Sequence, residues 1–345
     1  MKECRFYEKK EDGSVACQAC SHFCNIKNGG VGICGIRQNI NGKLYLLPYG
    51  KAAAVNIDPI EKKPLFHFLP GTYTYSFGTL GCNFRCANCQ NFDISQIYGK
   101  KGDIGYLKNI DWGVDLEPKD IVSRAKEAGC NSISYTYIEP TIFTEYALDV
   151  MKIAHEQGLK NVWVSNGYMS ENVVDAIVPF LDAINIDIKS FDNEFYRSNC
   201  GAKLQPVLEN CRRLARKSVW LEITTLVIPT LSDNSEILGN IAKFVHDDLG
   251  SHVPWHVSAF SGIISWKLKH LPSTSLEKLQ ETYAIGKKAG LEYVYLGNVI
   301  EAESENTCCP KCGERVIRRD GFQVSRNDDK GRCPRCAAKI PGVFI

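Results

Sequence analysis

Short apolar runs alternate with amphipathic segments along most of the chain. The apolar runs are rich in β-branched and aromatic residues, which predicts strands. They cover residues 74–78, 132–137, 161–165, 183–188, 219–227, 254–260 and 292–296. Helical periodicity falls between them, over residues 118–129, 142–158, 170–180, 204–217, 234–248 and 274–289. In the first helical segment, Pro118 marks the start and Gly129 marks the end.

This alternation of strands and helices predicts an α/β fold made of right-handed βαβ units around a parallel sheet. Such units form either a partial or near-complete TIM-like (β/α) barrel or an open doubly wound sheet, and periodicity alone does not separate the two. In both architectures, ligands bind at the carboxyl ends of the strands.

The two ends of the chain have a different composition from the middle. Residues 1–50 are rich in cysteine and glycine with little periodicity, which predicts a small metal-stapled module. Residues 51–71 are interrupted by prolines and are predicted to form an ordered connector. The barrel is expected over residues 72–304, and residues 305–345 are expected to form a separate cysteine-stapled tail.

Charge and hydropathy exclude several classes of protein. Lysine and arginine total 41 against 39 acidic residues, for a net charge of +2, so no global field favours nucleic acid or an anionic membrane as a partner. The N-terminus lacks the apolar core of a signal peptide, and no apolar run approaches the roughly 18 residues of a membrane span. We therefore expect a soluble, cytoplasmic protein.

Sixteen cysteines are the most unusual feature of the composition. In a reducing compartment they predict metal binding rather than a disulfide framework. Eleven of them form three tight groups, namely Cys17, Cys20, Cys24 and Cys34; Cys82, Cys86 and Cys89; and Cys309, Cys312, Cys333 and Cys336. The others have no clear pattern, and most are expected to be small buried apolar residues. These are Cys4, Cys130, Cys200, Cys211 and Cys308.

The middle group lies in the stretch GCNFRCANCQN, residues 81–91, directly after the first predicted barrel strand. Cys82, Cys86 and Cys89 follow a C-x3-C-x2-C spacing. A structural zinc site usually has four protein ligands, and an iron–sulfur cubane has four irons to ligate. Three thiolates therefore leave one position for a ligand from outside the group: a distant residue at a zinc site, or a non-protein molecule at a cluster.

This spacing after the first strand of a predicted βα barrel resembles the signature of radical S-adenosylmethionine (SAM) enzymes. The resemblance implies that Cys82, Cys86 and Cys89 are catalytic and hold a 4Fe-4S cluster. SAM would then chelate the fourth iron and be cleaved reductively to a deoxyadenosyl radical that abstracts hydrogen. One departure is Asn88, because the position before the last cysteine is often aromatic in this family.

Other strand ends extend the resemblance. In YTYIEPT, residues 135–141, Glu139 stands where relatives carry a GGE-type motif, and it would accept a hydrogen bond from the SAM amino group. The two glycines of that motif are absent here. Ser165 and Asn166 in VSNGY would contact polar groups of the ligand, with a simple capping and turn role as the alternative.

Asp187 and Lys189 in NIDIK lie two apart on a strand and so point to the same side. They resemble the D-x-K motif of glycyl-radical-enzyme activases, which implies contact with the methionine end of SAM; a self-contained salt bridge is the alternative. His256 in PWHVSAF is predicted to face the cofactor or substrate, with a hydrogen-bonded core histidine as the alternative.

The widest resemblance is to AmmeMemoRadiSam-system radical SAM proteins, relatives of the pyruvate formate-lyase activating enzymes. It rests on stretches such as CQACSHFCNIKNGGVGICGIRQN (17–39), DPIEKKPLFHFLPG (58–71) and YVYLGN (293–298). It implies a flavodoxin- or ferredoxin-type reductant and, in the activase version, a protein substrate. A non-catalytic electron carrier or adaptor and an RNA-modifying enzyme are the alternatives, although the near-neutral charge disfavours RNA.

The outer cysteine groups predict further metal sites. The tail motifs CPKC and CPRC place Cys309, Cys312, Cys333 and Cys336 in a zinc-ribbon pattern. Cys17, Cys20, Cys24 and Cys34 fit either zinc or a second 4Fe-4S cluster, with zinc preferred and His22 expected to be exposed to solvent. A lid over the active site is expected from residues 91–116 or from the tail if the substrate is small.

Overall fold

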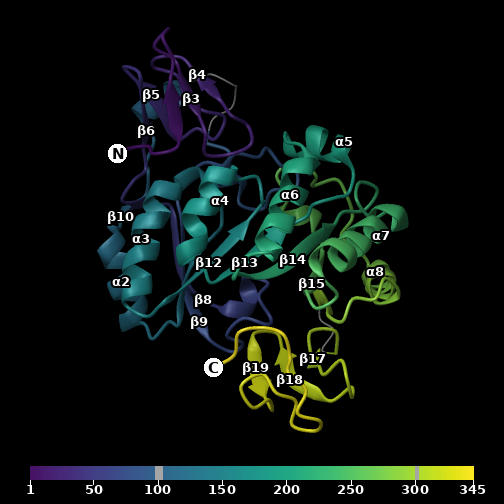
Figure 1. Cartoon of the computed structure of the whole chain (residues 1–345). Helices are drawn as coiled ribbons and strands as arrows, with labels where there is room; N and C mark the ends of the chain where they lie inside the picture. Colours follow the sequence, from purple (N-terminus) through teal and green to yellow (C-terminus); the bar gives the residue numbers. More distant parts are fainter. Residues whose placement is uncertain (98–103, 300–302) are drawn as a thin grey trace.

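The computed structural model describes residues 1–97, 104–299 and 303–345. Its centre is an eight-stranded sheet of order β16-β15-β14-β13-β12-β11-β9-β8 (Figure 1). Ladders from β9 through β16 are parallel, and β8 runs antiparallel to β9. The bounds are β8 Ala54–Pro59, β9 Tyr73–Gly78, β11 Ser132–Tyr135, β12 Lys160–Ser165, β13 Ala183–Asp187, β14 Trp220–Val227, β15 Trp255–Ala259 and β16 Val294–Gly297.

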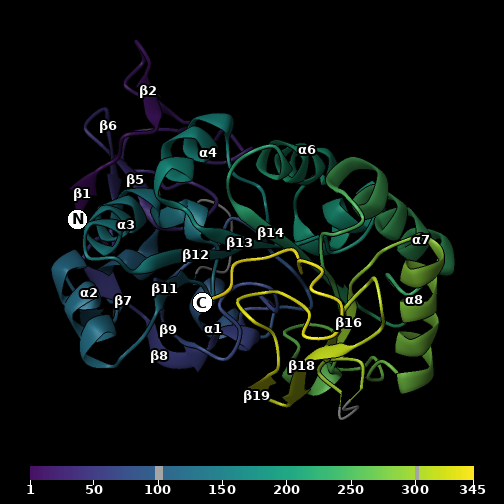
Figure 2. The ribbon, with the colours of Figure 1, turned by 60° about the horizontal axis from the view of Figure 1, so that its bottom comes forward.

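The parallel strands follow chain order, so every connecting helix packs on the same face of the sheet. Figures 1 and 2 show these helices around the outer side of the curved sheet. Helices on one face exclude an open doubly wound sheet, which has helices on both faces. The barrel is partial, since in the part of the chain that the structure describes no ladder joins β16 to β8. The helices are α2 Pro118–Glu127, α3 Thr144–Glu156, α4 Glu171–Ile177, α6 Leu204–Ala215, α7 Ser235–Phe244 and α8 Leu276–Lys288.

Shorter elements occupy the connections. They are the α-helical turns α1 Phe92–Ser95 and α5 Asn193–Phe195; the 3-10 turns η1 Ile60–Lys62, η2 Gly105–Lys108, η3 Pro140–Phe143, η4 Val178–Phe180 and η7 Gly262–Ile264; and the π turns η5 Tyr196–Cys200 and η6 Val245–Leu249. Among the described residues, no helix has both the length and the apolar composition needed to cross a bilayer.

The predicted connector, residues 51–71, contains a barrel strand that the sequence analysis missed. β8 pairs with β9 along its whole length, from Ala54 opposite Gly78 to Pro59 opposite Tyr73. Its side chains are mostly exposed or half-buried, so they carry no apolar alternation to signal a strand. At the end of β8, the Asp58 carboxylate pairs with the ammonium of Lys63, the residue after η1, at 2.6 Å, and this ion pair stabilises the turn that follows the strand.

The rest of the connector closes the amino-terminal end of the barrel. Phe68 and Leu69 pack with Val162 and Ala183, which lie in the first halves of β12 and β13. The tail strengthens this closure, because the Val343 amide donates to the His67 carbonyl at 2.8 Å and the Val343 carbonyl accepts from Leu69 at 2.7 Å.

The tail forms a small antiparallel sheet of β17 Thr307–Cys308, β18 Arg315–Asp320 and β19 Gln323–Arg326. It lies across the amino-terminal end of the barrel, and the N-terminal module lies at the other end of the molecule (Figures 1 and 2). The tail therefore does not lie over the triad, but its residues Asp320, Gly321 and Phe322 line a cavity that also contains His256, so a lid over a small substrate stays a prediction. The other predicted lid, residues 91–116, includes residues 98–103, which lie outside the described residues.

The N-terminal module contains two three-stranded sheets where the sequence showed little periodicity, because its strands are too short to reveal a period. They are β1 Lys2–Glu3, β6 Lys43–Leu46 and β5 Arg37–Ile40, then β2 Tyr7–Lys9, β3 Val15–Cys17 and β4 Asn25–Ile26. A further short pair joins β7 Lys51–Ala52 to β10 Val114–Asp115. A fully buried ion pair between Arg37 and Glu145 of α3, with a closest N–O distance of 2.5 Å, fastens the module to the barrel.

His67 makes the closure sensitive to pH. Its ring is buried and bonds the Pro341 carbonyl at 2.7 Å and the Tyr295 hydroxyl at 2.6 Å. Burial lowers the pKa of His67 to about 4. Below pH 6.5 the unfolded chain therefore binds a proton at His67, whereas the folded chain binds it only near pH 4. The free energy of unfolding falls as the pH drops from 6.5 towards 4.

We predict that this histidine removes up to about 3 kcal/mol of unfolding free energy between pH 6.5 and 4. Denaturant unfolding of wild type and His67→Gln at pH 7 and pH 4.5 measures the effect. The variant should lose less stability on acidification than wild type, because it has no group to protonate there. Equal losses in the two proteins would contradict the assignment.

Candidate active site

Two glycines place the cysteine triad loop against its neighbours. A Cβ on Gly78, the last residue of β9, would lie 2.4 Å from the Thr136 carbonyl oxygen, so only glycine allows β9 to approach the end of β11 so closely. Gly81 has a φ of +89°, and a Cβ there would lie 2.4 Å from the Cys34 carbonyl oxygen. The loop is thus pressed between the barrel mouth and the N-terminal module.

Backbone hydrogen bonds hold the triad loop from segments far away in the sequence. On one side the imidazole of His22 bonds the Asn83 carbonyl at 2.8 Å, so His22 is half-buried at this interface and not simply exposed as predicted. Two later segments also hold the loop. The backbone amide of Arg85 donates to the Cys200 carbonyl, and that of Ala87 donates to the Asn199 carbonyl. The amide of Trp266 donates to the Cys89 carbonyl, and that of Lys267 donates to the Ala87 carbonyl.

The three triad thiols are buried or half-buried and each has a hydrogen-bond partner. Cys82 accepts from the Phe84 amide at 3.5 Å, and Cys89 lies 3.2 Å from the Ser95 hydroxyl. Burial raises the pKa of Cys82 and of Cys89. Thiolates at these positions therefore need positive charge nearby, which bound metal supplies.

A zinc site at the triad would need a fourth protein ligand close to its three thiols. Among the described residues, the group of His, Cys, Asp and Glu side chains found compact enough for a metal ion is the tail set of Cys309, Cys312, Cys333 and Cys336, and not the triad.

Cys200, at the end of η5, is a neighbour of the triad that the sequence analysis missed. Its thiol hydrogen-bonds Cys86, and that bond together with burial raises the pKa of Cys86. Cys200 stands 111 residues after Cys89, measured from the sequence numbers, and no spacing pattern connects them. Cys4, Cys130 and Cys211 are buried as expected, while Cys308 is exposed.

Asp187 and Lys189 provide a charged pair beside the triad. Asp187 ends β13, and its carboxylate accepts from the Lys189 ammonium at 2.9 Å. Burial alone would lower the pKa of Lys189, but the Asp187 carboxylate and the neighbouring Cys86 thiol raise it well above its usual value. Lys189 is therefore a fixed cation near the sulfur atoms.

Glu139, Ser165 and Asn166 come together at the ends of β11 and β12. The Glu139 Oε1 accepts from the Ser165 hydroxyl at 2.8 Å, and Oε2 accepts from the Asn166 amide at 2.7 Å. The Asn166 side chain then donates to the Asn83 side chain at 2.8 Å, which links all three to the triad loop. The side-chain amide nitrogen of Asn83, Nδ2, is buried and has no hydrogen-bond partner among the described residues.

The Glu139 carboxylate retains capacity for another donor. Thr141 donates to Oε1 through both its amide and its hydroxyl, so that oxygen accepts three hydrogen bonds while Oε2 accepts one. A carboxylate offers about four acceptor positions, and two of them belong to each oxygen. Burial raises the pKa of Glu139, against hydrogen bonds that favour the charged form.

A tyrosine takes the conformation that a glycine of the GGE-type motif would adopt freely. Tyr137 has a φ of 69°, a left-handed value that costs energy for any residue with a Cβ. Its hydroxyl donates to Asp58 at 2.7 Å and its carbonyl accepts from Asn91 at 2.7 Å. These contacts hold the bend, so the departure from the family motif does not displace Glu139.

His256 does not join this network. Its ring bonds Glu222 at 2.6 Å, and the same carboxylate accepts from the amides of Phe66 and His67 in the connector. Although burial alone would raise the pKa of Glu222, its hydrogen bond with His256 helps to lower it. His256 also lines a cavity of about 550 Å³ at the open seam of the barrel, together with Ser258, Gly297 and Phe322.

The tail cysteines form a compact set. Cys309 and Cys336 lie 3.6 Å apart, as do Cys312 and Cys333. A tetrahedral ion with metal–sulfur bonds of about 2.3 Å separates its thiolates by about 3.8 Å. The set therefore fits a single tetrahedral ion.

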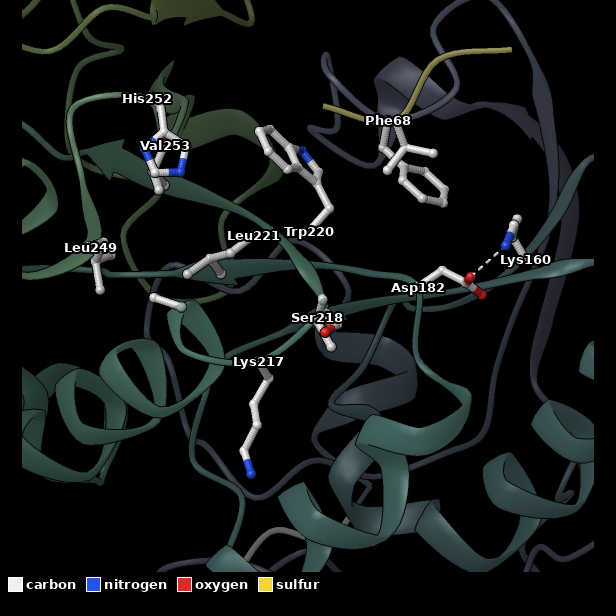
Figure 3. A pocket seen from close by; sticks show the side chains of 13 residues that line it. Phe68, Lys160, Asp182, Lys217, Ser218, Trp220, Leu221, Leu249, His252 and Val253 are labelled. Carbon is white, nitrogen blue, oxygen red and sulfur yellow. Dashed lines mark hydrogen bonds and ion pairs between the residues drawn. The ribbon is translucent and has the colours of Figure 1, made fainter. Parts of the chain in front are cut away.

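A second cavity, of about 410 Å³, lies at the amino-terminal end of the barrel (Figure 3). The salt bridge between Lys160 and Asp182, at 2.8 Å, forms part of its wall, and Trp220 and Phe68 line it. It is at the end that the connector and the tail close, opposite the triad. We therefore do not assign it to the active site.

The chain is similar to several known proteins. Residues 77–240 match the model of the Radical SAM superfamily. The chain is 42% identical over 347 residues to uncharacterized protein MJ0808 of Methanocaldococcus jannaschii, with 100% of both proteins covered. It is 23% identical over 171 residues to the pyruvate formate-lyase 1-activating enzyme of Escherichia coli K12, covering 48% of this chain and 66% of that enzyme.

Among solved structures, a radical SAM methyltransferase from Sphaerobacter thermophilus shares the fold, with a TM-score of 0.50 and 14% identity over 72% of this chain and 71% of that one. The family model begins at the last two residues of β9, and it covers the triad and the strand ends that carry Glu139, Asn166 and Asp187. The chain therefore belongs to the radical SAM superfamily and is related to the pyruvate formate-lyase activating enzymes.

Proposed function

We propose that this chain cleaves SAM reductively at a 4Fe-4S cluster held by Cys82, Cys86 and Cys89, and uses the product to abstract hydrogen from a substrate. The observation that carries the proposal is a chain of hydrogen bonds from the triad loop to Glu139. Asn83 of the loop accepts from the Asn166 side chain, and the Asn166 amide donates to the Glu139 carboxylate. A ligand bound at the triad would meet this carboxylate and the Asp187–Lys189 pair together.

The residues around the triad have separate roles. Cys82, Cys86 and Cys89 would hold the cluster, which in its reduced form would supply one electron for cleavage of the sulfonium C–S bond of SAM to methionine and a deoxyadenosyl radical, and that radical would take a hydrogen atom from the substrate. Glu139 accepts the SAM ammonium at the free position of Oε2, and Lys189 pairs with the SAM carboxylate. Ser165 and Asn166 hold Glu139 in place.

The same arrangement provides further polar groups for the ligand. Thr224 lies directly opposite Asp187 in the β13–β14 ladder, and its hydroxyl is buried with no partner among the described residues. We assign it to the ligand-binding surface, since a buried hydroxyl without a hydrogen bond is costly. His256 is assigned to the seam cavity, where it faces substrate and not SAM.

For the substrate, we propose an activase-like reaction in which the hydrogen donor is a glycine of a partner polypeptide. The similarity to an activating enzyme and the D-x-K pair support this choice. The tail does not cover the triad, so it would not block a large partner there. A small molecule entering the seam cavity is the second candidate, and it is supported by the cavity's volume of about 550 Å³.

The remaining assignments complete the proposal. A flavodoxin- or ferredoxin-type protein supplies the electron. Zinc occupies the tail set, where it stabilises the closure of the barrel. The AmmeMemoRadiSam branch is the proposed place of the chain within the superfamily.

We predict that the anaerobically reconstituted protein, given dithionite and SAM, forms deoxyadenosine, measured by chromatography. Cys86→Ala should abolish the product because one cluster ligand is lost. Cys211→Ala, which removes a buried thiol of α6 outside the three groups, is the matched control and should retain it. A full cluster with no SAM binding in the wild type would overturn the proposal and favour a non-catalytic electron carrier.

A second prediction concerns Cys200. The thiols of Cys200 and Cys86 hydrogen-bond each other. A Cys86 thiolate that ligates iron carries no proton, so Cys200 would then be the donor, and a donor to a cluster ligand favours the reduced, more negative state. Removing a hydrogen bond worth about 1 kcal/mol should lower the midpoint potential in Cys200→Ala by about 40 mV, the one-electron equivalent. Potentiometric titration followed by EPR measures this shift, with Cys130→Ala as the control. An unchanged or higher potential in Cys200→Ala would show that the bond does not act on the cluster.

A further inference from the structure

The triad loop contains one buried polar group that the proposed function leaves unused. Asn83, the residue after Cys82, is fully buried, and its side-chain nitrogen Nδ2 has no hydrogen-bond partner among the described residues. A buried N–H donor without an acceptor is costly, and such groups are rare in folded proteins. A molecule that binds beside Asn83 and offers an acceptor would remove this cost.

Hydrogen bonds that begin at a backbone amide fix the orientation of the Asn83 side chain. The Tyr168 amide can only donate, so the Asn166 atom that it meets at 3.0 Å is the oxygen Oδ1. The Asn166 nitrogen Nδ2 then faces Asn83, and Asn83 Oδ1 accepts its hydrogen bond at 2.8 Å. Turning either side-chain amide by 180° would place two donors against each other. Nδ2 is therefore the unpaired atom of Asn83.

The neighbours of Asn83 indicate which acceptor this donor takes. On one side, Asn166 also donates through its backbone amide to Glu139 Oε2 at 2.7 Å, so Asn83 adjoins the carboxylate assigned to the SAM ammonium. On the other side, Cys82 Sγ lies 3.8 Å from Asn83 Oδ1, so the same side chain borders the cluster position. The methionine part of SAM carries its ammonium and its carboxylate on one carbon atom. A ligand held at Glu139 by its ammonium therefore brings its carboxylate towards the Asn83 donor.

We infer, on the basis of the proposed function, that Asn83 Nδ2 donates a hydrogen bond to the carboxylate of SAM. Lys189 supplies positive charge for this carboxylate, and Asn83 supplies a donor of fixed direction. Since a carboxylate offers about four acceptor positions, it accepts from both groups. The loop that provides the cluster ligands thus also selects ligands that retain the α-carboxylate, which makes Asn83 a specificity-determining residue.

Binding of SAM and of decarboxylated SAM to the full-length, reconstituted protein tests this inference. Equilibrium dialysis without a reductant measures the two dissociation constants, and no cleavage accompanies the binding. Asn83→Asp keeps the acceptor for Asn166 and removes the donor, so it should bind SAM about tenfold more weakly than the wild type. Its affinity for decarboxylated SAM should not fall, because that ligand lacks the carboxylate. The preference for SAM over decarboxylated SAM should therefore fall about tenfold.

A second variant keeps the test independent of the charge that aspartate introduces. Asn83→Ala also removes the acceptor for Asn166, so both ligands should bind more weakly, but the preference should fall by the same factor as in Asn83→Asp. Asn199→Ala is the matched control and should keep the wild-type preference, because Asn199 Nδ2 already bonds Asn88 Oδ1 at 2.8 Å.

The outcomes separate this inference from the proposed function. An unchanged preference in both Asn83 variants, with SAM bound by the wild type, would overturn the inference alone. An unchanged preference together with a shifted midpoint potential of the cluster would assign the donor to the cluster, and this result would also overturn it. Absence of SAM binding to the wild type with a complete cluster would overturn the proposed function and the inference with it.

Discussion

Holding three thiols out of water at the barrel mouth is the constraint on which the rest of the structure depends. A thiolate is costly in a low-dielectric site unless positive charge or hydrogen-bond donors surround it. Here the donors are backbone amides of the triad loop itself, and the nearby cation is Lys189. The close approach at Gly78 and Gly81 is needed because it brings the loop against the strand ends and the N-terminal module.

The carboxyl end of the barrel carries the candidate active site, and the amino end carries contacts that stabilise the fold. At the carboxyl end, polar side chains of successive strands meet the triad loop, as Glu139 and Asn166 do. At the amino end, the buried Glu222 carboxylate binds the connector, and His67 joins the connector to the tail. The contacts that close the barrel lie at its amino end. The carboxyl end is therefore free to carry polar groups.

Most of the barrel could be predicted from the sequence, because each predicted strand and helix carries its own local periodicity. The grouping of Glu139, Asn166 and Asp187 near the triad was also foreseeable, because parallel strands end on one edge of a sheet. β8 could not be predicted, because its residues show no alternation of apolar and polar positions. It is a strand because it pairs with β9. The contact of Cys200 with Cys86 and the position of the tail arise from tertiary packing between segments distant in sequence. Neither had a local signal.

The most direct test of the central claim is the EPR spectrum of the reduced protein with and without SAM. If SAM binds the open iron of the triad cluster, its addition must change the signal from that cluster. Glu139→Gln should need a higher SAM concentration for the same change, because Oε2 then no longer offers a charged acceptor. Identical spectra at saturating SAM, from a protein with a complete cluster, would contradict the account.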